Sequence, residues 1–185
     1  MKNLYVFVDS NSFGSSAVSS DDLNTAIHTA VGIVDKTILH DRCGIDDFAI
    51  VETDDDATAD VIICEKHRTD LELHGNLSVE LLPSISETDG KNIYLDTTEI
   101  SDVSSSYDKP FAEIVCEAVC RELCHVLGVN ERLGLHRFGS KEYQKDFGLM
   151  LSPYSPYNGK LGKEYYLTDD EVAALKATVS SMVEQ

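Results

Sequence analysis

Apolar residues recur along residues 23–38 at the spacing of one face of an α-helix, and this stripe limits the folds open to the chain more than any other feature. Its members are Leu23, Ala26, Ile27, Ala30, Val31, Val34 and Ile38. A helix with one apolar face has to bury that face against another layer of structure. Residues 4–8, which read Leu-Tyr-Val-Phe-Val, precede it and predict a buried first β-strand.

The rest of the chain continues to alternate between strand and helix patterns. Short β-rich runs occur at residues 48–52, 60–66 and 92–96. Residues 67–90 show no clear periodicity and are expected to be a hairpin or irregular, and residues 101–109 are expected to form a serine-rich loop. Pro110 and Gly128 are placed to begin and end a second long helix. This order of elements predicts a fold of the α+β or α/β class.

The clearest helix signature lies near the end of the sequence. Thr168 and Glu171 have the spacing of a capping box, and Leu167 and Val172 have that of a hydrophobic staple. Before this helix, residues 129–166 are rich in glycine, tyrosine and proline. A loop segment of that length in a compact domain usually has a functional origin.

The chain is strongly acidic, with 33 Asp and Glu against 15 Lys and Arg and a formal net charge of −18. We expect no nucleic-acid partner and no membrane partner, because phosphates would be repelled. No apolar run reaches the roughly 18 residues of a transmembrane span, and the N-terminus lacks a signal-peptide pattern. With five cysteines, an odd number, we expect a reducing compartment, and hence a cytoplasmic protein or a component of a larger particle.

Three of the cysteines, Cys116, Cys120 and Cys124, repeat every four residues along the predicted second helix. A rigid helix separates the outer two by about 12 Å, which is too far for one zinc ion with bonds of about 2.3 Å. We therefore interpret the stripe as buried free thiols that pack as small hydrophobic residues. A thiol-based metal or redox sensor is the alternative.

Residues 121–131, R-E-L-C-H-V-L-G-V-N-E, carry the pattern with the most chemical content. A zinc-peptidase helix reads H-E-x-x-H, in which two His ligands lie one turn apart and the Glu acts as general base on a metal-bound water. Glu122 and His125 occupy the base and second-ligand positions here, whereas Arg121 occupies the first-ligand position. Gly128 and Glu131 stand where a sharp turn and a third ligand would follow.

This pattern resembles, in degenerate form, that of the metzincin zinc metallopeptidases, and of their matrixin-like branch in particular. Two later segments resemble the family in the same order. Residues 148–154 look like its Met-turn, with Met150 as the methionine, and residues 167–175 look like its closing helix. The resemblance implies a twisted mixed sheet, a long active-site helix, a Met-turn and a C-terminal helix.

The same resemblance implies one metzincin-like domain over residues 1–185. Residues 1–128 would form its N-terminal sheet and helices, and residues 129–185 its Met-turn subdomain. In that family an edge strand of the sheet pairs with bound peptide. The resemblance places this strand at Ile93, Tyr94 and Leu95.

Arg121 determines the function that we expect. A guanidinium group has no lone pair to offer a metal and stays charged, whereas a carboxylate such as Glu131 can bind zinc. We expect a protein that has lost zinc and peptidase activity and holds no cofactor, with Glu122 as a vestigial general base. It would bind a protein or peptide along the edge strand, or serve as a structural subunit of a larger assembly. Arg121 would replace the charge of the metal by pairing with Glu131 or Glu122.

The alternative is an active zinc metallopeptidase with an unusual ligand set. Its ligands would be His125, Glu131 and, as a displaced third ligand, His136, with Glu122 as the general base. A weaker candidate for a structural metal site comprises His67, Asp70 and His74.

Overall fold

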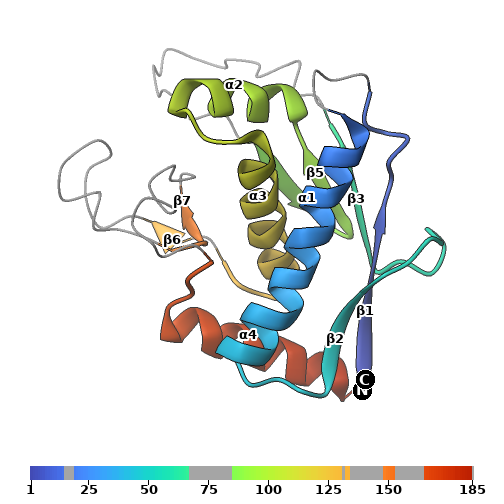
Figure 1. Ribbon diagram of the computed structural model, residues 1–185. Coiled ribbons are helices and arrows are strands. Elements are labelled where there is room, and N and C mark those ends of the chain that lie inside the picture. Colours follow the sequence, from blue (N-terminus) through green and yellow to red (C-terminus); the bar gives the residue numbers. More distant parts are fainter. Residues whose placement is uncertain (15–18, 67–84, 131, 134–147, 153–164, 185) are drawn as a thin grey trace, which may run out of the picture.

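The computed structural model in Figure 1 describes residues 1–14, 19–66, 85–130, 132–133, 148–152 and 165–184. Its main feature is a five-stranded sheet with the strand order β2-β1-β3-β5-β4. The strands are β1 (Lys2–Val8), β2 (Phe48–Glu52), β3 (Val61–Glu65), β4 (Ser86–Asp89) and β5 (Asn92–Leu95). β1, β2, β3 and β5 are parallel, and β4 runs antiparallel to β5. The predicted mixed α and β class is confirmed.

Helices cover one face of this sheet, and α1 and α3 lie side by side on it (Figure 1). The helices are α1 (Ser20–Gly32), its π-helical continuation η1 (Ile33–Arg42), α2 (Thr97–Tyr107), α3 (Phe111–Val126) and α4 (Asp169–Val183). A separate two-stranded parallel sheet pairs β6 (Arg132–Leu133) with β7 (Leu151–Ser152). None of the described helices combines the length and the apolar character needed to cross a membrane.

The core lies between the sheet and the pair α1 and α3. Alternate strand residues point into it and are completely buried, namely Val6, Val61, Ile63, Ile93 and Leu95. The predicted apolar stripe of residues 23–38 is buried along its whole length against them. Each large aliphatic side chain buried in this way stabilises the fold by about 1.5–3 kcal/mol.

Helices α1 and α4 both begin with a side-chain cap, and the cap of α4 is the one predicted from the sequence. Ser19 caps α1, because its Oγ accepts a hydrogen bond from the backbone N–H of Asp22 at 3.2 Å. Thr168 and Glu171 form the predicted capping box of α4, with each side chain accepting from the backbone N–H of the other residue. These bonds satisfy helix N–H groups that have no partner within the helix.

The serine-rich loop predicted at residues 101–109 is wrong, because most of it belongs to α2. Asp96 caps this helix by accepting two backbone hydrogen bonds at 3.1 Å, and Ile100 and Val103 bury its inner face. The serine hydroxyls do not break the helix, since that of Ser101 donates to a backbone carbonyl one turn earlier. Serine has an indifferent helix propensity, so the cap and the tertiary contacts decide the conformation here.

The prediction that Ile93, Tyr94 and Leu95 form the edge of the sheet is also wrong. They belong to β5, which pairs with β3 on one side and with β4 on the other. β4 comes from the region that showed no periodicity and joins β5 through a tight turn at Gly90, whose φ is +59°. Asp89-Gly90 is a sequence signature of such a hairpin, and the four-residue strand before it is too short to be recognised by alternation.

Gly128 ends α3 as predicted, and the structure explains why glycine is required there. Its φ is +85°, in the left-handed region, and the N–H of Val129 donates to the carbonyl of Cys124 across the turn. A Cβ at this position would overlap Thr178 Oγ1 and lie 3.0 Å from Thr178 Cβ. Gly128 therefore allows α4 to approach the end of α3 closely.

Replacing Gly128 by alanine should cost more stability than replacing Gly44. Both residues have positive φ, so either substitution strains the backbone by about 1–2 kcal/mol. Only Gly128→Ala also displaces Thr178, which adds about 1–3 kcal/mol, because the space at Gly44 is open. Urea unfolding of the two variants measures the difference. Equal losses would contradict the close approach, and Thr178→Ala should recover part of the loss in Gly128→Ala.

Candidate functional site

Helix α3 carries the predicted site, and its central part is enclosed on all sides, since every residue from Ile114 to Cys124 is buried. Its side chains point in three directions. Cys120 contacts α1, Glu122 reaches β4 at the end of the sheet, and His125 contacts the segment that follows the helix. Helix α3 therefore makes direct contacts with α1, with β4 and with the segment that follows it.

Glu122, the predicted vestigial base, is 4% exposed, and both of its carboxylate oxygens accept hydrogen bonds. Ser86 Oγ donates to Oε1 at 2.6 Å, and Thr88 Oγ1 donates to Oε2. Both donors lie on β4, so Glu122 ties α3 to the last strand of the sheet. Sequence reasoning missed these partners because they lie 36 and 34 residues away along the chain.

His125 is partly buried, and its Nδ1 lies 2.7 Å from the carbonyl oxygen of Val129. Since a carbonyl can only accept, Nδ1 carries the proton, and in the neutral ring Nε2 carries the lone pair. A backbone carbonyl orients many metal-binding histidines in the same way. The tautomer of His125 is therefore one that could ligate a metal through Nε2.

Arg121 is buried, with 7% of its surface exposed, and so does not extend into solvent. It stands one helical turn before His125, in the position where the pattern requires a first ligand. Glu131, one of its two predicted partners, lies outside the described residues. The other, Glu122, directs its oxygens to Ser86 and Thr88. The pairing of Arg121 with a carboxylate stays a prediction.

Met150 is completely buried and belongs to the same core as α3. It follows Gly148, whose φ is +128°, and Leu149, whose N–H donates to the carbonyl of Tyr166 at 2.9 Å. Met150 thus has its side chain in the core directly after this turn, and its assignment as the methionine of a Met-turn stays a prediction.

The described part of the chain does not offer a complete set of metal ligands. It contains no group of three His, Cys, Asp or Glu side chains placed to hold one ion. At the predicted site, His125 has suitable geometry, Arg121 offers no lone pair, and the carboxylate of Glu122 is already hydrogen-bonded. Three predicted candidates for metal sites lie outside the described residues, namely Glu131, His136 and the set His67, Asp70 and His74.

The three cysteines of α3 are free thiols in the core. The Sγ of Cys120 donates to the carbonyl of Ala30 on α1, and the Sγ of Cys116 accepts from the hydroxyl of Tyr165. Burial raises the pKa of the Cys120 and Cys124 thiols, so both stay protonated at neutral pH. Because redox reactions of cysteine need the thiolate, this environment disfavours a redox sensor and favours simple packing.

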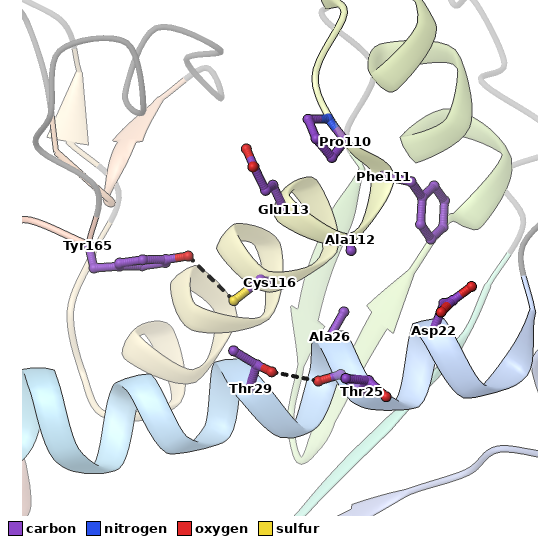
Figure 2. A pocket seen from close by; sticks show the side chains of 10 residues that line it. All are labelled: Asp22, Thr25, Ala26, Thr29, Pro110, Phe111, Ala112, Glu113, Cys116 and Tyr165. Atoms are coloured by element: carbon purple, nitrogen blue, oxygen red, sulfur yellow. Dashed lines mark hydrogen bonds between the residues drawn. The ribbon is translucent and has the colours of Figure 1, made fainter.

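A cavity of about 530 Å³ opens between the first turns of α1 and α3 (Figure 2). Thr25 and Thr29 line it from α1, Phe111 and Cys116 line it from α3, and Tyr165 closes one side. The residues of the predicted site do not line this cavity, which is therefore a separate feature of the surface.

No family model matches the chain, and no curated protein matches it significantly.

The two hydroxyls on β4 should stabilise the fold through Glu122. Ser86→Ala and Thr88→Val should each cost about 1.5–3 kcal/mol, because a buried carboxylate loses a donor. Ser105→Ala is a matched control, since that exposed hydroxyl donates to a neutral carbonyl, and it should change stability by less than about 0.5 kcal/mol. Denaturant unfolding measures all three. A Thr88→Val protein as stable as Ser105→Ala would show that Glu122 does not depend on β4.

The buried thiols should make the protein less stable above about pH 8.5, the ordinary pKa of cysteine. In that range the unfolded chain loses the protons of Cys120 and Cys124, whereas raised pKa values keep them bound in the folded protein. The free energy of unfolding then falls by up to about 1.4 kcal/mol per pH unit for each thiol. Urea unfolding between about pH 8 and pH 10 measures this slope.

The Cys120→Ala variant should have a shallower pH dependence than the parent protein. Val119→Ala on the same helix is the control, because it also opens a cavity in the core but removes no thiol. If the slope is the same in Cys120→Ala and Val119→Ala, the thiols are not its cause.

Proposed function

We propose that the chain is a metzincin-fold protein that has lost zinc binding and peptidase activity and acts as a protein-binding or structural subunit. The proposal rests on the burial of Arg121 and on the hydrogen bonds of its neighbour Glu122. Arg121 is buried in the first-ligand position, and Glu122 directs both carboxylate oxygens at hydroxyls of β4. A cation and a buried carboxylate that already accepts two hydrogen bonds thus stand where catalysis needs a ligand and a base.

The arrangement of elements supports the family part of this proposal. The sheet is mixed, α3 carries the motif, Gly128 makes a sharp turn behind it, and Met150 is buried next in order. The capped helix α4 then packs against the turn at Gly128. These are the features, in the same order, that the sequence resemblance implies.

The active alternative requires Glu122 to act on a metal-bound water. A general base must bring a carboxylate oxygen within hydrogen-bonding reach of the proton that it removes. Each oxygen of Glu122 already accepts a hydrogen bond from β4, so only the remaining lone pairs could take that proton, and the first-ligand position holds Arg121. The binding role is therefore favoured over the catalytic one. The five free cysteines are compatible with a protein that works in a reducing compartment.

The zinc content of the purified protein tests this proposal. We expect substoichiometric zinc by mass spectrometry and no cleavage of casein above background, because Arg121 cannot ligate. Arg121→His should increase zinc affinity, since it supplies a second imidazole one turn from His125. Arg121→Met is the matched control, because it removes the charge without adding a donor of that kind.

The opposite result is equally specific. Stoichiometric zinc that disappears in His125→Ala, together with chelator-sensitive cleavage that disappears in Glu122→Ala, would establish the active alternative.

A further inference from the structure

The strands of the main sheet are apolar on both faces, although within the described part of the chain helices cover only one. β1 contains Leu-Tyr-Val-Phe-Val, β2 Phe-Ala-Ile-Val and β3 Val-Ile-Ile-Cys, without the alternation of a half-exposed sheet. Continuous apolar runs are typical of parallel strands that are buried on both faces. The pattern therefore indicates that another layer of structure covers the second face as well.

The residues of this second face form a row across four strands, which we call the outer row. It comprises Val51 on β2, Tyr5 and Phe7 on β1, Ile62 and Cys64 on β3, and Tyr94 on β5. The strand register places Val51 beside Tyr5, Phe7 beside Ile62, and Cys64 beside Tyr94. None of the six is buried, and Tyr5 and Val51 are each 37% exposed, whereas the alternate residues facing the helices are buried.

Acidic residues border the outer row. Asp60 directly precedes β3 and Asp9 directly follows β1, both continuing the same alternation, and Asp89 ends β4. The carboxylate of Asp60 also accepts a hydrogen bond from the backbone N–H of Tyr5 at 2.9 Å. The basic residue Lys66 is already engaged, because its ammonium group lies 3.5 Å from Glu87 and 4.6 Å from the ring centre of Tyr94. The surface therefore combines an apolar centre with an acidic border.

We propose that the outer row binds an amphipathic helix of another protein, with an apolar stripe flanked by lysine or arginine. Helices are the elements that normally cover the second face of a parallel sheet, which favours a helix as the occupant. Basic flanks would meet the acidic border. A second copy of this chain is a poor occupant, because each copy carries a formal charge of −18.

This inference rests on the proposed function only for the role of protein binding, to which it assigns a surface. It does not depend on zinc, because the outer row lies on the opposite face of the sheet from α3. A zinc-containing, active protein would refute the proposed function and leave this surface to be tested by itself.

The alkylation rate of the Cys64 thiol can show whether a ligand covers the outer row. It is half-buried within the row, whereas Cys43, Cys116, Cys120 and Cys124 are buried. In the native protein an alkylating reagent should therefore modify Cys64 first, and mass spectrometry identifies the modified residue. A ligand on the outer row should slow this reaction.

The probe is a synthetic helical peptide of about 15 residues with an apolar face of leucine and flanks of lysine. We expect it to protect Cys64 from alkylation, and we expect the protection to weaken as salt is added. The control peptide has the same leucine pattern with glutamate in place of lysine, and it should not protect Cys64.

Variants at the exposed end of the row locate the binding surface. Tyr5→Thr and Val51→Thr keep strand-forming residues and should weaken peptide binding by about tenfold, as expected for the loss of an interface anchor. Tyr107→Thr on α2 is the matched control, because this tyrosine is 36% exposed but lies outside the row. It should leave binding unchanged.

Three results would overturn the proposal. Alkylation of Cys64 in the free protein as slow as that of Cys120 would mean that the chain itself covers the row. Sedimentation as a dimer, with Cys64 reactive only after dilution, would mean that a second copy covers it. Equal protection by the lysine and glutamate peptides would mean that the face attracts any apolar helix and does not select a basic partner.

Discussion

The burial of the central part of α3, residues 114–124, is the constraint on which the rest of the structure depends. A helix enclosed on all sides must find a partner inside the protein for each polar side chain that it carries, because an unpaired buried charge costs several kcal/mol. Glu117 pairs with Lys109 before the helix, Glu122 bonds to the hydroxyls of β4, and His125 donates to the turn behind it. Each of these bonds fixes a different neighbouring segment, so the polar residues of α3 also position the elements around it.

These bonds are compatible with the proposed loss of zinc, because they hold α3 and its neighbours together without a metal. In a zinc peptidase the ion holds the helix and the segment after it together, and its removal leaves carboxylates and imidazoles without a partner. Here hydroxyls, a backbone carbonyl and a glycine turn connect the same elements. In the function that we propose, the polar side chains of α3 hold neighbouring elements in place, and Arg121 would supply the positive charge that the divalent ion supplies in a zinc peptidase.

Local patterns in the sequence predicted those parts of the fold that local interactions determine. The stripe of residues 23–38, the capping box of α4 and the turn at Gly128 all depend on residues within a few positions of one another. The order of strands depends instead on pairing between distant segments, and here β5 was mistaken for the edge. The same limit applied to the site, since the motif identified Glu122 but could not indicate that its partners lie on β4.

The acidic charge of the chain has different consequences at different places. At the starts of α1 and α4, Asp21, Asp22, Asp169 and Asp170 lie near the positive ends of helix dipoles, where negative charge stabilises the fold. Asp9, Asp60 and Asp89 border the outer row, away from any helix start, and there they add to the repulsion within a chain of net charge −18. A basic partner at that face would reduce this repulsion while covering apolar surface. A partner that binds only the folded state raises the free energy of unfolding. A basic amphipathic helix on the outer row should therefore raise the free energy of unfolding of this chain more than an acidic helix does.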